Sequence, residues 1–186
     1  MPERIPIEEV NRLDEGEFVA RFGSLYERSP WVAEEAWNAR PFGGLDELHG
    51  AMARAVDSAP DEHKMGLILA HPDLAGKAAM AGELTLESTG EQASVGLDRL
   101  SPEEYEAFTK MNREYREKFG MPMIVCVREH TKESILKNAG ERLGNPRERE
   151  VQVALAEVHK IARLRLEDLV EGDGDGRGDR HGFSEM

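Results

Sequence analysis

The feature of this sequence that most constrains its fold is the shortage of segments suited to β-strands. Only residues 123–127, Met-Ile-Val-Cys-Val, form a short continuous apolar run typical of a strand, and no second such run exists to pair with it. The chain up to about residue 170 otherwise shows helical periodicity interrupted at Pro and Gly. An isolated strand cannot form a sheet. The sequence therefore predicts an all-α, single-domain helical bundle with a buried extended segment near residues 121–127.

Local signals mark where several helices should begin and end. Asp14 with Glu17, and Ser101 with Glu104, have the spacing of N-terminal capping boxes. Pro102 suits the first position of a helix because its missing N–H needs no partner there. Helices are expected at about residues 14–28, 31–39, 45–59, 61–70, 102–119, 131–143 and 147–171.

His71 stands at an expected corner between two helices. Pro72 disfavours the α conformation at the residue before it, so the preceding helix should end near Ala70. Asp73 is then placed to cap a short helix that runs through about Ala81. Such a corner would hold the imidazole in one direction. A single histidine more often caps a helix or satisfies a polar group in the core, so this alternative stays open.

A polar cluster near residue 90 also has two interpretations. Ser88 and Glu91 match a capping box at the start of a helix, in which each side chain bonds to a backbone N–H near the other residue. That role leaves Gln92 unexplained. The Gly-Lys dipeptide at residues 76–77 is not a phosphate-binding loop, because Ala follows where Ser or Thr is required.

The last long helix carries an arginine on its apolar face. Its apolar positions recur at three- and four-residue spacing. They are Val151, Ala154, Leu155, Val158, Ile161, Ala162, Leu166 and Leu169, and Arg165 falls among them. Arg165 must therefore extend to solvent or find an anion or a structural carboxylate. Arg163 lies off this stripe and is expected to be a solvated surface charge.

Composition limits the classes of partner. The chain has 186 residues, enough for one domain with a sizeable core, and a net charge of −13. Nucleic acid and anionic membranes are not expected partners, because their phosphates would be repelled. An anionic substrate would need a locally positive pocket. The single cysteine, Cys126, allows no internal disulfide and no Cys-based zinc site.

The absence of recognisable targeting signals predicts a cytoplasmic protein. There is no secretory signal pattern, no long apolar run, and no Ser-Lys-Leu address at the end. Residues 1–170 are expected to form the domain, and the Gly- and Asp-rich residues 171–186 a disordered tail. A calcium loop in this tail is disfavoured because it lacks the Glu that closes an EF-hand.

Several separated motifs have an order and spacing typical of one enzyme family. The motifs are His71-Pro72-Asp73-Leu74-Ala75-Gly76-Lys77, Ser88-Thr89-Gly90-Glu91-Gln92, Gly96-Leu97-Asp98, Phe119-Gly120-x-Pro122 and Lys160-Ile161-Ala162-Arg163-Leu164-Arg165-Leu166. Together with Ser29-Pro30-Trp31 and Arg40-Pro41-Phe42, they resemble the OHCU decarboxylase family over residues 5–170. OHCU is 2-oxo-4-hydroxy-4-carboxy-5-ureidoimidazoline, an unstable intermediate of urate breakdown.

The resemblance implies a function and a set of site residues. Family members remove the carboxylate of OHCU as CO2 and form (S)-allantoin without a metal or organic cofactor. It further implies a small-molecule substrate and a homodimer, with His71 as general acid/base and Glu91 as the second catalytic residue. The implied substrate-binding residues are Pro72, Ser88, Thr89, Gly90, Glu91, Gln92, Met123, Ile124, Val125, Cys126, Val127 and Arg165.

One motif departs from the family pattern. The family usually has Phe-Gly-Phe-Pro-Phe where this chain has Met121 and Met123 in place of the second and third Phe. Methionine is apolar and adaptable, so it can form a pocket wall but cannot provide an aromatic stack. The departure bears on pocket shape more than on the type of reaction.

Two other function classes remain as alternatives. A metal-dependent helical hydrolase could use some of His49, His63, His71, His130, His159 and His181. The chain has neither a His-Asp doublet nor a His-Glu-x-x-His helix, which disfavours that class. A non-enzymatic interaction module would leave Arg165 and the polar cluster near Glu91 unexplained.

Overall fold

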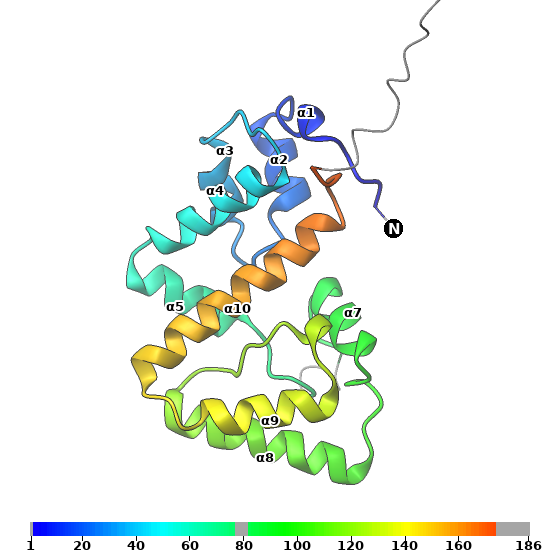
Figure 1. The fold of residues 1–186 in the computed structure, drawn as a ribbon, viewed down its shortest axis with the longest axis vertical. Helices are drawn as coiled ribbons and strands as arrows, with labels where there is room; N and C mark the ends of the chain where they lie inside the picture. The colour runs from blue at the N-terminus through cyan, green and yellow to red at the C-terminus, as the bar shows by residue number, and fades with distance from the viewer. Residues whose placement is uncertain (1, 77–81, 174–186) are drawn as a thin grey trace, which may run out of the picture.

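The computed structural model describes residues 2–76 and 82–173, and the regular elements in that part of the chain are helices and one isolated β-bridge (Figure 1). The α-helices are α1 (Ile7–Val10), α2 (Glu15–Phe22), α3 (Trp31–Trp37), α4 (Leu45–Asp57), α5 (Asp61–Ala70), α7 (Leu86–Ser94), α8 (Pro102–Phe119), α9 (Lys132–Arg142) and α10 (Arg147–Glu167). A short 3₁₀ helix, η1, covers Val127–Glu129. The predicted all-α, single-domain class is confirmed.

Helix α10 connects two groups of helices. It crosses the middle of the molecule, with α2, α3 and α4 on one side and α8 and α9 on the other (Figure 1). It packs against α4 and α5, while α8 packs against α9 and α7 against η1. Its inward face carries Ala154, Val158, Ala162 and Leu166, all buried, and Arg165 lies on that face near the C-terminal end. The stripe counted from the sequence therefore forms much of the buried face, which also includes Glu150 and Glu157, while Val151, Leu155 and Leu169 are partly buried.

Several predicted helix ends are confirmed by their hydrogen bonds. Asp14 and Glu17 form a capping box at the start of α2, and Ser101 and Glu104 form one at the start of α8. Helix α8 ends at Gly120, whose φ of 68° is in the left-handed region that favours glycine. These ends were predictable because the capping bonds join residues only a few positions apart.

Four local predictions are corrected. Helix α2 ends at Phe22 rather than near residue 28. The cap of α7 is Thr85, whose side chain accepts the N–H of Ser88, so Ser88 and Glu91 lie inside the helix. Asp73 caps no helix: residues 74–76 are non-helical, and its carboxylate contacts Arg116 at 3.1 Å. The rest of that predicted short helix, residues 77–81, lies outside the described residues. Helix α10 ends at residue 167 rather than 171.

The segment before η1 belongs to no helix or strand. Residues 121 and 123–126 are all buried there. One of its backbone partners is a side chain: Arg142 donates to the carbonyl oxygen of Ile124 at 2.6 Å. Because α9 supplies this donor, the segment is tied to the helix that follows it.

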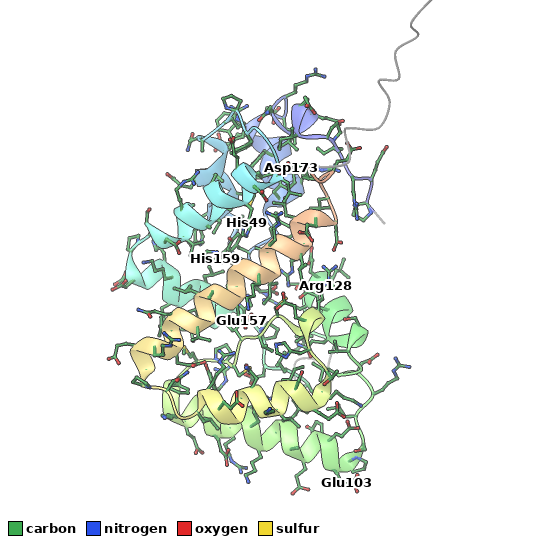
Figure 2. All side chains as sticks on the ribbon, in the orientation of Figure 1. His49, Glu103, Arg128, Glu157, His159 and Asp173 are labelled. Carbon is green, nitrogen blue, oxygen red and sulfur yellow. The ribbon has the colours of Figure 1, made fainter. Side chains whose placement is uncertain are left out.

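The two ends of the domain meet. Ile5 and Val170 form the isolated bridge, and Glu171 donates its N–H to Ile5. Asp173, labelled in Figure 2, accepts the N–H of Leu45 at the start of α4 at 2.7 Å. The first residues of the segment predicted as a tail thus contact the domain, and residues 174–186 lie outside the described residues. No described helix combines the length and apolar character needed to cross a membrane.

Candidate active site

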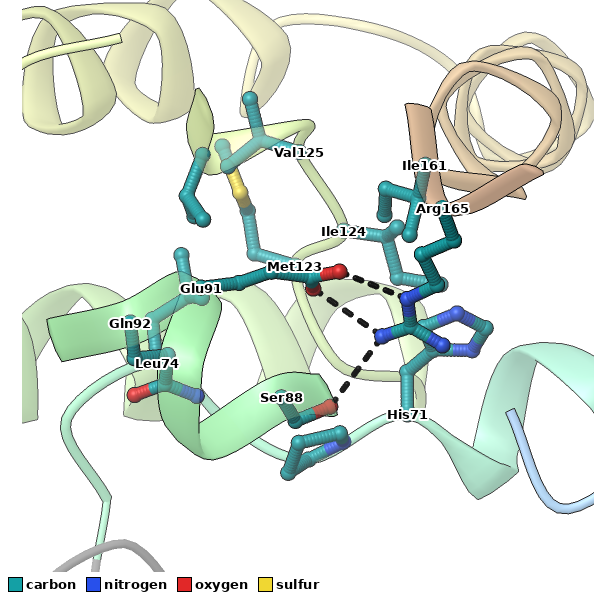
Figure 3. Close-up of a pocket in the computed structure, with 12 residues that line it drawn as sticks. His71, Leu74, Ser88, Glu91, Gln92, Met123, Ile124, Val125, Ile161 and Arg165 are labelled. Carbon is teal, nitrogen blue, oxygen red and sulfur yellow. Dashed lines mark hydrogen bonds and ion pairs between the residues drawn. The ribbon is translucent and has the colours of Figure 1, made fainter. Parts of the chain in front are cut away.

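Ten of the thirteen residues predicted for the site border one cavity between four elements. It lies where the end of α5, helix α7, the segment before η1 and helix α10 come together (Figure 3). Its volume is about 30 Å³, room for roughly two water molecules. The lining residues are His71, Pro72, Leu74, Ser88, Glu91, Gln92, Met123, Ile124, Val125, Val127, Ile161 and Arg165.

His71 is held by the helix that it ends. Its backbone is extended, with φ −73° and ψ 136°, as expected before Pro72. Its Nδ1 lies 2.9 Å from the carbonyl oxygen of Leu67, one turn back in α5. A carbonyl only accepts, so Nδ1 carries the proton in the neutral ring and Nε2 keeps its lone pair.

Burial sets the protonation state of His71. His71 is only 7% exposed, and desolvation lowers the pKa of its imidazole below the usual value. The bond to Leu67 and the charge of Glu27 oppose that change, and the charge of Arg165 reinforces it. At neutral pH the ring is therefore an uncharged base.

Arg165 and Glu91 form the main ion pair of the cavity. Arg165 Nε lies 2.6 Å from Glu91 Oε1, and Nη2 lies 3.0 Å from Oε2, a two-bond arrangement (Figure 3). The Ser88 hydroxyl is 3.5 Å from the same Nη2. Although burial opposes the charge, the contacts with Glu91 and Glu27 raise the pKa of Arg165 above its usual value. The predicted choice between solvent and an anionic partner is resolved in favour of carboxylates.

A second carboxylate behind Arg165 was missed by the sequence analysis. Glu27 is 1% exposed, and its Oε2 lies 3.0 Å from Arg165 Nη1. The hydroxyls of Thr85 and Ser88 donate to it at 2.7 and 3.1 Å. Its one sequence signal was its position two residues before the Ser29-Pro30-Trp31 motif of the family resemblance.

Gln92 shapes the cavity wall. Its side-chain oxygen accepts the N–H of Ala75 at 3.0 Å, and its amide nitrogen donates to the carbonyl of Asp73 at 3.3 Å. These bonds hold a turn in which Ala75 has a φ of 51°, an unusual value for a residue with a Cβ. Asn112 donates to Leu74 at 2.8 Å and fixes the same turn from α8.

Three of the predicted site residues do not line the cavity. Thr89 and Gly90 are exposed on α7, and the Thr89 hydroxyl donates to the Thr85 carbonyl within the helix. Cys126 is buried beside the cavity-lining residues, and burial raises the pKa of its thiol to about 11. Leu74 and Ile161 line the cavity without having been assigned to it.

A larger outer groove adjoins the cavity. Glu91 and Arg165 also line this groove, whose volume is about 570 Å³ and whose other walls include Arg21, Leu86 and Arg128. The Glu91–Arg165 ion pair therefore stands between the inner cavity and the outer groove.

Two of the histidines considered as metal ligands make other contacts. His49 and His159 face each other where α4 crosses α10 (Figure 2), and His49 Nε2 is 2.9 Å from the His159 carbonyl. The ring nitrogens of His159 bond to Tyr26 at 2.9 Å and Asp57 at 3.0 Å. Within residues 2–76 and 82–173, no cluster of three His, Cys, Asp or Glu side chains suits a metal ion.

Comparison with known proteins decides the family. The family described as OHCU decarboxylase matches residues 11–167. The chain belongs to the OHCU decarboxylase family. A relative from Halalkalicoccus jeotgali, 2-oxo-4-hydroxy-4-carboxy-5-ureidoimidazoline decarboxylase, is 44% identical over 92% of this chain and 96% of its own length. A relative of the same name from Haloferax volcanii is also 44% identical, over 87% and 94%.

A solved structure supports the same assignment. It is described as (S)-allantoin synthase and superposes with a TM-score of 0.69 at 29% sequence identity, covering 89% of this chain and 54% of that one. As a family member, the chain is a decarboxylase, a carboxy-lyase. Met121 and Met123 stand at the two positions where the family resemblance implied Phe. Met121 is fully buried, and Met123 lines the cavity wall.

Proposed function

We propose that this decarboxylase converts OHCU to (S)-allantoin and CO2, with His71 as the general acid/base. The observation that supports this most is that His71, Glu91 and Arg165 border one cavity although they come from three separate helices. The cavity offers a base, an acceptor and a planar cation. These are the groups that a decarboxylation of a nitrogen-rich heterocycle requires.

Arg165 stabilises the charge that the reaction develops. When the carbon–carbon bond to the carboxylate breaks, its electron pair remains on the ring and spreads into the adjacent C=N group. A guanidinium held in a water-poor site favours that charge, because its position is fixed before the reaction. Removal of one such donor in an enzyme typically costs about 10²–10³ in rate.

His71 moves the proton and sets the product's configuration. Since its pKa is lowered, the ring enters as a neutral base that accepts a proton from the substrate at Nε2. The imidazolium then returns that proton to the ring carbon from one face only, and the nitrogen that received the electron pair takes one further proton from water. Because a planar carbanion in water is protonated on both faces, this placement produces the single enantiomer.

Substrate entry needs a change at Glu91. The cavity of about 30 Å³ is far smaller than a heterocycle carrying ureido and carboxylate groups. Glu91 is the more accessible partner of Arg165, with a side chain 15% exposed, and it also lines the outer groove. On binding, its carboxylate leaves Arg165 and accepts the N–H groups of the substrate instead.

The test is an enantioselective assay of His71→Ala. Fresh OHCU is generated by urate oxidation, and (S)-allantoin is followed by circular dichroism. The variant should lose the accelerated, enantioselective phase, a loss of about 10²–10⁴-fold for a general acid/base. His63→Ala, on the same helix but outside the cavity, should keep it. Full stereoselective turnover by His71→Ala would remove His71 from this role.

We further propose that the protein acts as a cytoplasmic homodimer without a metal or organic cofactor. The electron sink in this reaction is the substrate's own C=N group, so the chemistry can proceed on side chains alone. Turnover should persist after dialysis against a chelator. Light scattering of the eluted protein should give twice the 20.8 kDa mass of one chain.

A further inference from the structure

We propose that Glu27 is a positioning residue for catalysis: it is the fixed counter-ion that keeps Arg165 in place when Glu91 moves to the substrate. It does not line the cavity and acts through Arg165 and Ser88, which do. For its kinetic consequences this inference rests on the proposed function. Its electrostatic consequences for His71 can be measured without any substrate.

The hydrogen bonds of Glu27 give it one orientation. Thr85 donates to Oε1 at 2.7 Å, while Ser88 and Arg165 contact Oε2 at 3.1 and 3.0 Å. Two of these partners belong to α7 or its cap, and the third to α10. Glu27 therefore joins the two helices that carry the cavity's polar groups.

The two carboxylates on Arg165 differ in how freely they can leave. Each carboxylate lines a hollow, but Glu27 is 1% exposed and is bound on both oxygens, whereas the Glu91 side chain is 15% exposed. Loss of Glu91 to a substrate leaves Arg165 with Glu27 at Nη1 and the carbonyl oxygen of Ser24 at 3.2 Å. A buried cation without a counter-ion is costly, so one fixed carboxylate lets the other exchange.

Glu27 also acts on the charge of His71. The charged groups on the helices packed around the imidazole are Arg165 from α10, Glu91 from α7 and Glu27 from the segment after α2. On its other side His71 borders a hollow whose charged lining residues are Glu27, Arg28 and Glu83. Glu27 favours the imidazolium and Arg165 opposes it, so Glu27 offsets the guanidinium.

The experiment compares Glu27→Gln with Glu27→Asp in the full chain. NMR titration of the His71 ring should show a lower midpoint in Glu27→Gln than in the parent, because the charge of Glu27 no longer offsets that of Arg165. In Glu27→Asp, which keeps the charge, the midpoint should stay near the parent value. The ring signal is assigned by its loss in His71→Asn.

Kinetics supply the second arm. Glu27→Gln should lower kcat/KM by roughly 10–100-fold, mainly through kcat, because a displaced guanidinium no longer faces the developing charge. In the same variant, the limb of the pH profile of kcat/KM that reports the ionisation of His71 should move to lower pH. Glu27→Asp should recover part of kcat and keep the parent limb. The control is Glu104→Gln on α8, which removes the ion pair with Lys132 of α9 and should change neither kcat nor the pH limb.

The outcomes separate the two proposals. If the parent forms no (S)-allantoin, the proposed function fails, and the titration of His71 still tests Glu27. An active parent whose Glu27→Gln variant keeps both the kcat/KM and the His71 midpoint would overturn this inference. A loss of activity that is fully explained by a lower melting temperature of the variant would also overturn it. If Glu27→Gln does not fold, Glu27→Asp decides: its shorter reach should reduce kcat several-fold, and an unchanged kcat overturns the proposal.

Discussion

The molecule contains two buried arginine–glutamate clusters that are equally buried but differ in whether all partners of the arginine are enclosed by the fold. Arg165 and Arg142 are each 5% exposed and each contacts a buried glutamate, Glu27 at 3.0 Å and Glu150 at 2.5 Å. Around Arg142 the available bonds are filled from within the fold. Around Arg165 one partner, Glu91, has a side chain that is 15% exposed and borders the outer groove, whereas Glu27 is 1% exposed.

The Arg142 cluster is a closed network. Glu150 accepts bonds from Arg142, Asn145 and the Tyr115 hydroxyl, and Arg142 also donates to the Ile124 carbonyl. Burial and the bond to Glu150 raise the pKa of Tyr115 well above its usual value, so the phenol stays protonated. The comparison shows that a buried ion pair alone does not indicate a site. An adjoining cavity and a partner that can leave are the distinguishing features.

The largest expected effect is on stability and comes from a substitution in the closed Arg142 cluster. Glu150→Gln should lower the free energy of unfolding by about 3–5 kcal/mol, because it leaves Arg142 buried without its counter-ion. Urea denaturation of the variant and the parent measures the change. A loss below about 1 kcal/mol would mean that Arg142 finds another partner and that the cluster is not closed.

The next largest effect is on catalysis and comes from a substitution in the Arg165 cluster. Arg165→Lys should lower kcat/KM by about 10²–10³-fold, because an ammonium cannot bridge Glu91 with two parallel bonds or present a planar face to the substrate. The assay is (S)-allantoin formation by circular dichroism. Lysine keeps the charge, so stability should change less than in Glu150→Gln. Near-parental turnover would show that charge alone suffices at this position.

The smallest effect is a pH dependence of stability from the buried histidines. Burial lowers the pKa of His71 and of His49, so the unfolded chain binds more protons than the native one below about pH 6.5. The free energy of unfolding should therefore fall as pH decreases through this range. Urea titrations at several pH values should show a shallower fall in His71→Asn. Equal slopes would contradict a lowered pKa for His71.

The sequence predicted the local part of the site well. The end of α5 and the extended backbone at His71 follow from Pro72, and the burial of Arg165 follows from its place on the apolar stripe of α10. It misplaced the start of α7, because Thr85 and Ser88 are both favoured capping residue types and Ser is the better of the two, although Thr85 is the cap in the structure. Only packing decided that Ser88 should face Glu27 and Arg165 instead.

By itself, then, the sequence determined the helical class, most helix ends and the family to which the chain belongs. Those features depend on hydrogen bonds and side-chain spacings within a few residues along the chain. The tertiary structure decided which carboxylates hold the guanidinium. Glu91 lies 74 residues from Arg165, and Ser88 lies 61 residues from Glu27. Contacts over such separations leave no periodic trace, because they arise only when helices pack and a buried charge must find its partner.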